Sequence, residues 1–280
     1  MQALRKTLPL LTLLVLLVSS AQAATWTAIN VPGAAETQAA GINGAGDIVG
    51  FYTDSGHVTH GFLLRSGNFT TLDVPGATQT VARGINDSGL IAGYYSTRDR
   101  DGLGFLFDGQ NFTTLDFPGF AITVANGIDN AGDVVGWYGN GGANPDSHGF
   151  KWTNGSFTTI EVGPAGKTIL TGINNRGHIV GYSPFSYKSF LINPQGRVRK
   201  YNLPGGGLAF GINDHKIIAG SNVDPNFNYG FKLNVISKSL MQLRFRGALW
   251  TFCQGINNSG QIVGSYLKKN GTHHGFLRTK

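Results

Sequence analysis

One segment of the chain recurs six times, and this repeat limits the possible folds more than any other feature. The first copy begins with GINGAGDIVGFY at Gly41, and the others begin at Gly84, Gly127, Gly172, Gly211 and Gly255. The copies start about 39 to 45 residues apart, a spacing found where each repeat is one small unit of several strands. The sequence therefore predicts a ring or stack of repeated β units.

Each copy contains four short apolar segments separated by turn residues. In the second copy they predict strands at 80–86, 90–95, 104–107 and 112–117. In the segment 90–95, both the odd-numbered and the even-numbered positions carry apolar or small residues. Alternate residues of a strand face opposite sides of the sheet, so both faces are expected to be buried. The 42 glycines argue against helices, because glycine costs roughly 1 kcal/mol in a helix interior relative to alanine. These features favour blades packed between neighbouring blades.

The two ends of the repeat region complement each other. The last copy ends after its third strand, at GFLRTK from Gly275, whereas ATWTAINVPGA from Ala24 matches the fourth strand NFTTLDVPGA from Asn68. The N-terminal strand can therefore pair into the last blade and protect the edges that an open array would expose. We predict an all-β, six-bladed β-propeller of four-stranded blades in one domain, residues 24–280. A β-solenoid is the competing fold, but it would not need a permuted terminal strand.

The first 23 residues have the pattern of a secretory signal peptide. Arg5 and Lys6 precede the apolar run 8–18, and Ala21-Gln22-Ala23 provides a small-residue cleavage site. The apolar run is too short for a membrane anchor, so the product is expected to be secreted or periplasmic and not membrane-spanning. The single Cys253 leaves no internal disulfide.

The ordered motifs G-I-N-x-x-G-x-I-V-G-x-Y, H-G-F-L and F-T-T-L-D-V-P-G resemble the bacterial extracellular repeat group called the HAF family. His-Gly-Phe is complete only at His60, His148 and His274. The resemblance covers nearly all of residues 24–280 and implies a secreted repeat protein. It implies no particular ligand.

The loops between the second and third strands vary most between copies, and function is expected on such loops. Aromatic residues at the ends of the preceding strands could stack on sugar rings, or they could fill the widening space between blades. The candidate ligand-binding residues on this variable face are Tyr52, Tyr95, Arg98, Tyr138, Asp146, Tyr187 and Asp224.

A second variable set lies on the strand expected nearest the axis. The residue before each Gly-Ile differs in every copy, and the six residues are Ala40, Arg83, Asn126, Thr171, Phe210 and Gln254. Among these, Arg83, Asn126 and Gln254 could offer hydrogen-bond donors to a ligand in a central channel. Neutral drift at a solvated channel explains the variation equally well.

No residue pattern indicates a metal or cofactor. The repeated Asn-x-x-Gly suits a turn, in which the asparagine side chain caps the backbone and glycine supplies positive φ, better than a calcium loop. The three His-Gly-Phe histidines belong to different blades, so we expect hydrogen-bonded structural roles rather than a shared ion. We predict no cofactor, no metal and no catalytic residue.

Charge is distributed unevenly along the chain. Residues 225–280 contain eight Lys or Arg and no acid. A basic sector of this kind attracts anionic polysaccharide, lipid or nucleic acid, although an ordinary solvated surface is the simpler interpretation. Nucleic acid is not expected as a partner of an exported protein.

We therefore predict a monomeric binding or scaffold module for an extracellular glycan or a cell-envelope protein. The alternative is an enzyme acting on polysaccharide with the loop carboxylates of Asp99, Asp101, Asp146 or Asp224. A structural surface repeat is a third possibility. Paired carboxylates around a pocket would favour the enzyme.

Overall fold

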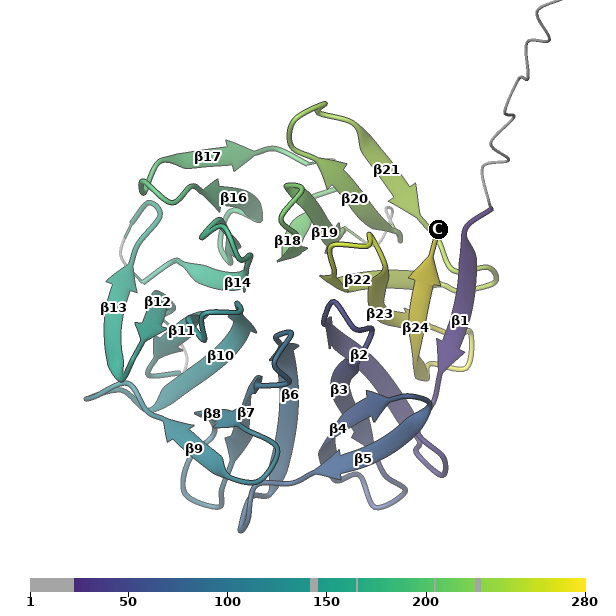
Figure 1. The fold of residues 1–280 in the computed structure, drawn as a ribbon, viewed down its shortest axis with the longest axis horizontal. Helices are drawn as coiled ribbons and strands as arrows, with labels where there is room; N and C mark the ends of the chain where they lie inside the picture. Colours follow the sequence, from purple (N-terminus) through teal and green to yellow (C-terminus); the bar gives the residue numbers. More distant parts are fainter. Residues whose placement is uncertain (1–22, 142–145, 165, 204, 225–227) are drawn as a thin grey trace, which may run out of the picture.

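The computed structural model shows six antiparallel sheets of four strands arranged around a central axis (Figure 1). It describes residues 23–141, 146–164, 166–203, 205–224 and 228–280. The predicted signal peptide lies almost entirely outside them. The described residues form strands and turns without a helix, so they include no helical segment that could cross a membrane. The predicted all-β, six-bladed propeller is confirmed.

The first three blades follow one another in the sequence, and within each blade the chain runs outward from the axis (Figure 1). Blade 1 consists of β2 (Glu36–Ile42), β3 (Ile48–Thr53), β4 (Thr59–Arg65) and β5 (Asn68–Leu72). Blade 2 consists of β6 (Gln79–Ile85), β7 (Ile91–Ser96), β8 (Leu103–Phe107) and β9 (Phe112–Leu115). Blade 3 consists of β10 (Ile122–Ile128), β11 (Val134–Gly139), β12 (His148–Thr153) and β13 (Ser156–Ile160).

The last blade differs from the others because it combines three strands from the C-terminal end of the chain with one strand from the N-terminal end. Blade 4 consists of β14 (Ile169–Ile173), β15 (Ile179–Ser183), β16 (Lys188–Ile192) and β17 (Val198–Tyr201). Blade 5 consists of β18 (Leu208–Ile212), β19 (Ile217–Ser221), β20 (Gly230–Asn234) and β21 (Leu240–Leu243). Blade 6 consists of β22 (Trp250–Ile256), β23 (Ile262–Leu267), β24 (His273–Thr279) and β1 (Thr25–Ile29).

Strand β1 closes the ring. It pairs antiparallel with β24, from Thr25 opposite Thr279 to Ile29 opposite Gly275. Its Trp26 ring lies 4.9 Å from the Phe276 ring of β24 and 5.6 Å from the Phe245 ring of the connection between β21 and β22, measured between centroids. The prediction that the N-terminal strand completes the last blade is confirmed.

A glycine and a phenylalanine form the constant core of every blade. In blade 3, Gly136 of the second strand lies opposite Phe150 of the third. A Cβ on Gly136 would overlap the carbonyl oxygen of Val124 and come within 2.9 Å of the Phe150 ring. The six phenylalanines at this position are each at most 1% exposed, and they are Phe62, Phe105, Phe150, Phe190, Phe231 and Phe276. We call this set of pairs the glycine–phenylalanine layer.

The glycine of each Gly-Ile-Asn motif lets neighbouring innermost strands approach each other. A Cβ on Gly127 would lie 2.9 Å from the Cα of Gly172 in the next blade, and one on Gly41 would lie 2.7 Å from the carbonyl oxygen of Arg83. Backbone therefore packs directly on backbone around the axis. The turn glycine after this motif has positive φ, for example 85° at Gly132, and in blade 5 Lys216 adopts φ 56° instead.

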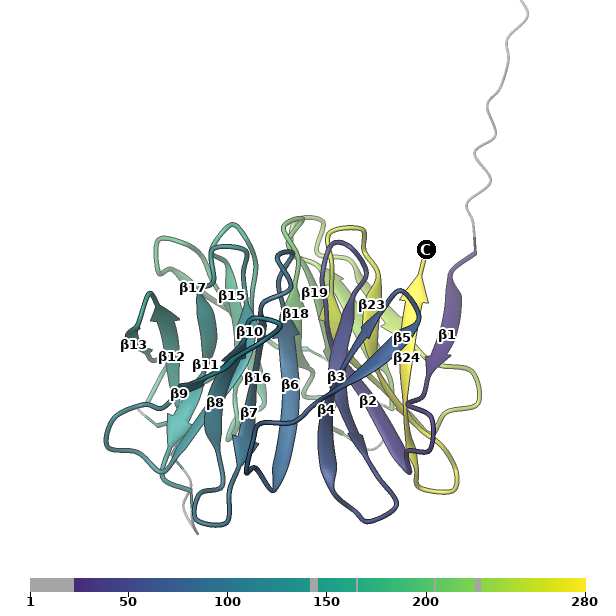
Figure 2. The same ribbon diagram turned by 60° about the horizontal axis from the view of Figure 1, so that its bottom comes forward.

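The two faces of the ring are built from different connections (Figure 2). The turns between first and second strands, together with those between third and fourth strands, form what we call the turn face. The loops between second and third strands lie with the blade-to-blade connections on the opposite side, the loop face. Hydrogen bonds join these two kinds of connection, from the N–H of Ala35 to the carbonyl of Thr53 and from Thr78 to Ser96, each 2.8 Å.

Candidate functional site

Each innermost strand carries one β-bulge, and it falls on the residue that differs in every copy. In blade 2 the register against the second strand shifts between Ala82 and Gly84, which leaves Arg83 without a partner. The same shift occurs in all six blades. The six bulge residues are Ala40, Arg83, Asn126, Thr171, Phe210 and Gln254. Bulges redirect side chains and are frequent next to active sites.

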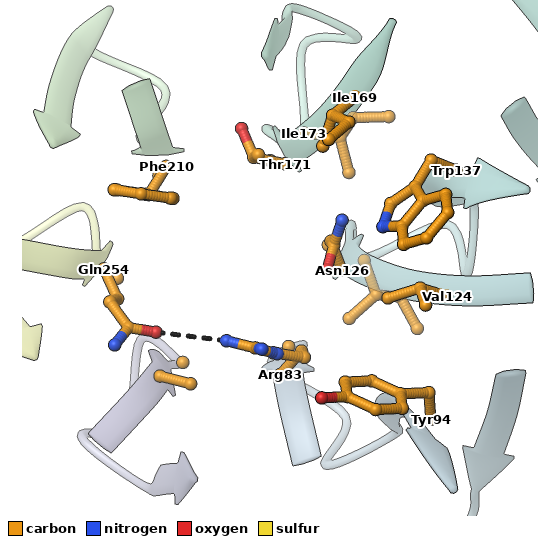
Figure 3. Close-up of a pocket in the computed structure, with 18 of the residues that line it drawn as sticks. Arg83, Tyr94, Val124, Asn126, Trp137, Ile169, Thr171, Ile173, Phe210 and Gln254 are labelled. Atoms are coloured by element: carbon orange, nitrogen blue, oxygen red, sulfur yellow. Dashed lines mark hydrogen bonds between the residues drawn. The ribbon is translucent and has the colours of Figure 1, made fainter. Parts of the chain in front are cut away.

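All six bulge residues line one cavity of about 430 Å³ on the axis of the ring (Figure 3). Second-strand rings from three adjacent blades, Tyr94, Trp137 and Tyr182, complete the wall. Gln79 and Asp101 line it as well, and the Asp101 loop places the mouth at the loop face. The volume falls within the roughly 300–1,000 Å³ typical of small-molecule sites. The six bulge residues, which differ in every copy, therefore face a single cavity.

A ring of isoleucines forms the floor of this axial cavity. One isoleucine comes from each Gly-Ile-Asn motif, and each is only 5–8% exposed. The same six side chains border a second cavity of about 70 Å³ toward the turn face. They are Ile42, Ile85, Ile128, Ile173, Ile212 and Ile256. The central channel is thus divided by an apolar constriction.

Below the isoleucines, the asparagines of the motif link each blade to the next. Asn86 donates its side-chain N–H to the carbonyl of Asp129 at 3.0 Å, while its Oδ1 accepts the N–H of Leu90 at 2.9 Å. Equivalent interblade bonds start from Asn43, Asn174, Asn213 and Asn257. The asparagine therefore caps its own turn, as expected, and its side chain also bonds to the next blade around the ring. Blade 3 has Asp129 at this position, and its burial raises the pKa of that carboxyl.

Arg83 places its guanidinium group in the cavity, and only some of its N–H donors have hydrogen-bond acceptors among the described residues. Arg83 donates from Nη1 to Oε1 of Gln254 across the axis at 3.4 Å, and its Nε is buried without a hydrogen-bond partner among the described residues. Its Cζ lies 5.4 Å from the centre of the Phe51 ring and 5.6 Å from that of Tyr94. Figure 3 shows the side chain extending into the cavity.

The other polar bulge residues are partly engaged with backbone. Asn126 donates its side-chain N–H to the carbonyl of Leu170 at 2.8 Å. The Thr171 hydroxyl lies within hydrogen-bond distance of the carbonyls of Val180 and Ala209, at 3.1 and 2.9 Å. The carbonyl oxygen of the Asn126 amide and the amide nitrogen of Gln254 form no hydrogen bond with the described side chains. At the level of the bulges, these two groups and Arg83 are the polar groups that a ligand would meet.

The structure separates two neighbouring pairs of rings, because Tyr94 and Trp137 line the cavity whereas the following residues, Tyr95 and Tyr138, lie between blades. Tyr95 and Tyr138 are only 8% and 5% exposed, and their hydroxyls share hydrogen bonds with threonines of the fourth strand. Tyr52 makes the same bond to Thr71 at 3.0 Å. Space filling between blades therefore accounts for these three rings. The rings that line the cavity, Tyr94, Trp137 and Tyr182, each directly follow the glycine of the second strand. This position in the sequence distinguishes them from the rings one residue later.

The predicted loop residues do not gather at one place. Arg98 is exposed, and Tyr187 is 53% exposed with φ 50°. Asp146 accepts the N–H of Asn140 at 2.7 Å and lies 3.5 Å from His148. Asp224 is half-buried beside Gly205, whose carbonyl accepts its N–H. None of these four residues lines the axial cavity.

The described residues contain no group of three or more His, Cys, Asp or Glu side chains arranged to hold a metal ion. The three motif histidines each bond to a different partner in their own blade: His60 to Asp73, His148 to Glu161 and His274 to Asn30. Of the four candidate loop acids, only Asp101 lines the axial cavity.

Comparisons with known proteins identify the fold. No known protein family model matches the chain, and no curated protein matches it in sequence. Solved structures do match. Virginiamycin B lyase from Staphylococcus aureus has TM-score 0.55 and 11% identity, with 92% of this chain and 100% of that chain covered. A lectin from Aleuria aurantia has TM-score 0.56 and 11% identity, with 87% and 91% covered. Regucalcin from Agrobacterium tumefaciens, a calcium-binding protein, has TM-score 0.55 and 14% identity, with 87% and 93% covered.

At these identities the similarity concerns the fold alone. The same ring carries a lyase, a lectin and a calcium-binding protein, so function has to be argued from the side chains of this chain. The resemblance to HAF repeats stays a prediction from the motifs.

Proposed function

We propose that the protein is an exported binding module that takes a small carbohydrate unit into the axial cavity from the loop face. The observation that carries this proposal is that three features of the innermost strands occur at the same positions. The bulges, the cavity and the variation between copies all fall on the same six residues. Where packing alone governs a repeat, equivalent positions keep equivalent residues.

The chemistry of the wall suits a sugar ring. Trp137 and Phe210 approach the cavity from different blades (Figure 3), and aromatic faces pack against the C–H face of a sugar. The amides of Asn126 and Gln254 offer an acceptor and a donor to hydroxyl groups. The wall combines these polar groups with aromatic rings and isoleucines, and small-molecule sites use such placed polar groups to fix the orientation of a ligand. The lectin among the structural neighbours is consistent with this use of the fold.

Binding is favoured over polysaccharide cleavage. Canonical glycoside hydrolysis needs two carboxyl groups flanking one bond, and Asp101 is the one carboxyl group among the cavity-lining residues that the structure describes. The enzyme therefore remains the second candidate.

A glycan array followed by calorimetry with the purified protein tests the proposal. We expect a monosaccharide or terminal sugar to bind, and Trp137→Ala to weaken binding at least tenfold. Tyr187→Ala is the matched control, because it removes an exposed ring of the loop face that does not line the cavity. Loss of binding in Tyr187→Ala with full binding in Trp137→Ala would place the ligand on the loops and contradict the proposal.

A further inference from the structure

The axial cavity holds one cation and one anion that do not pair with each other. Among the residues that the structure describes, Arg83 is the only cationic one that lines it, and the only anionic one is Asp101, from the exposed part of the blade 2 loop. The two make no ion pair, and no other carboxylate among the described residues lies within 4.0 Å of the Arg83 guanidinium. Unlike Arg83, two other arginines do form ion pairs with carboxylates: Arg65 with Asp47 and Arg100 with Asp116.

The surroundings of Arg83 hold it in place without neutralising it. Two rings flank the guanidinium, Phe51 and Tyr94, at 5.4 and 5.6 Å from its carbon, and Gln254 accepts one N–H at 3.4 Å. Its Nε is buried and has no partner among the described residues. A buried donor without an acceptor costs roughly 1–3 kcal/mol, and more when it is charged. An anionic acceptor in the cavity would remove that cost.

The geometry of the guanidinium selects the shape of that acceptor. Its N–H groups form a planar fork that matches a carboxylate through two parallel hydrogen bonds. A single cation next to neutral amides balances one negative charge. A phosphate monoester carries about two negative charges at neutral pH, and it would leave the second one unpaired with Asp101 at the mouth. The site therefore fits a monoanion better than a phosphate.

We propose that the ligand is a sugar acid, a hydroxylated ring whose carboxylate is held by Arg83. This assignment rests on the proposed function and narrows it from sugars in general to uronic acids. With its carboxylate on Arg83, the ring lies between the aromatic walls, where Asn126 and Gln254 meet its hydroxyls. Trp137 and Phe210 cover its less polar faces (Figure 3). The five remaining bulge positions then set which uronic acid fits.

Calorimetry with glucuronate, galacturonate, their methyl esters and the two neutral parent sugars tests this assignment, at constant ionic strength. We expect at least one of the two acids to bind ten or more times tighter than its own ester and its neutral parent. The ester keeps the shape of the acid and loses only the charge, so this comparison requires no variant. Equal affinity for acid and ester would overturn the sugar-acid assignment and leave carbohydrate binding intact. Binding of none of the six would overturn the sugar-acid assignment, and the glycan array alone decides the proposed function.

Two substitutions at one residue then locate the charge effect. Arg83→Gln should reduce the preference for acid over ester to less than threefold, whereas Arg83→Lys should keep part of it, because it retains the charge and loses the fork. Arg65→Gln is the control, with the same change in charge in an exposed side chain paired with Asp47 at 2.9 Å. An acid preference that survives in Arg83→Gln and falls in Arg65→Gln would refute the role of Arg83. Thermal melting of each variant establishes that it is folded.

Discussion

Two levels of the same blades obey opposite rules. At the glycine–phenylalanine layer all six blades carry the same two residues, and every phenylalanine is at most 1% exposed. At the bulge level, one residue beyond the innermost-strand partner of the layer glycine, the six blades carry six different residues. Both levels belong to the same sheets, so neither strand propensity nor position in the chain explains the difference.

The difference follows from what surrounds each position. A Cβ on any of the second-strand glycines would overlap a carbonyl oxygen of the innermost strand, so one residue type is dictated. The bulge residue has no backbone partner and faces a cavity, so packing leaves its type open. Substitutions in the constant layer should therefore change stability, and substitutions at the bulges should change binding.

Removal of the strand that completes blade 6 should have the largest effect. Deleting residues 24–31 uncovers Phe276 and removes the Trp26 ring, which packs 4.9 Å from it. Trp26 is half-buried, and Ile29 of the same strand is 5% exposed. Loss of a large buried apolar side chain costs about 2–5 kcal/mol, and at 2–4 °C per kcal/mol the melting temperature should fall by roughly 10 °C. A melting curve unchanged in calorimetry would mean that the constant layer does not need β1.

A matched pair of substitutions separates the two levels directly. Gly136→Ala places a methyl group against the Val124 carbonyl and the Phe150 ring, and it should cost at least the 1–3 kcal/mol typical of overpacking. Gln254→Ala removes a half-buried bulge side chain with one long hydrogen bond, and it should stay within about 0.5–1 kcal/mol. Urea denaturation measures both. A larger cost for Gln254→Ala would reverse the comparison.

Blade 6 breaks the constancy of the core at one position. Arg278 pairs with Ile262, where the equivalent third-strand residue of every other blade is large and apolar: Leu64, Phe107, Trp152, Ile192 or Leu233. Arg278 is 8% exposed, and its Nη1 has no partner among the described residues. Burial and the charges of Arg278 and Lys280 lower the pKa of Lys232 in the adjacent blade. The basic stretch of the sequence thus includes a buried cation that makes no ion pair with the described carboxylates.

Replacement of Arg278 by leucine, the residue at the equivalent position of blades 1 and 5, should stabilise the protein. Arg278→Leu removes an unsatisfied buried donor and the repulsion from Lys232, and it should raise the free energy of unfolding by about 1–2 kcal/mol. The reverse exchange in blade 5, Leu233→Arg, should lower it. Denaturant titration of both variants provides the measurement. Destabilisation by Arg278→Leu would show that its contact with the Trp26 ring, 5.8 Å away, outweighs the cost of burial.

The sequence predicted the ring, its closure and the strands of the second copy to within two residues, because spacing and turn glycines are local signals. It also placed the bulge residues near the axis. It did not show that Tyr94 and Trp137 enter the cavity rather than Tyr95 and Tyr138, because the alternation along a strand separates its two sides without showing which side faces the axis. Nor did it explain why copy 4 has Ser189 in place of the third-strand glycine. In the structure this hydroxyl donates to Gly207 of the next blade at 2.8 Å, where most blades place a threonine.

The smallest expected effect concerns the motif histidine, which three blades share and which has different neighbours in two of them. His60 and His274 occupy the same third-strand position, and each stacks on a tyrosine, at 5.0 and 5.5 Å between ring centroids. Burial tends to lower the pKa of His60, but the hydrogen bond and charge of Asp73, 2.9 Å away, together with Asp54, outweigh it and raise the pKa above 6.5. Burial and the charge of Lys268 lower the pKa of His274 below 6.5.

These opposite shifts give the two histidines opposite effects on stability. The raised pKa of His60 adds stability that is fully present below the unfolded value of 6.5 and is lost as the pH rises through the folded pKa. The lowered pKa of His274 works the other way, since its protonated ring is disfavoured in the fold and stability falls as the pH drops below 6.5. NMR titration of the ring protons should therefore give a midpoint above 6.5 for His60 and below 6.5 for His274. Equal midpoints would mean that the repeat imposes one environment on this position, which would extend the rule of the constant layer to residues at the loop face.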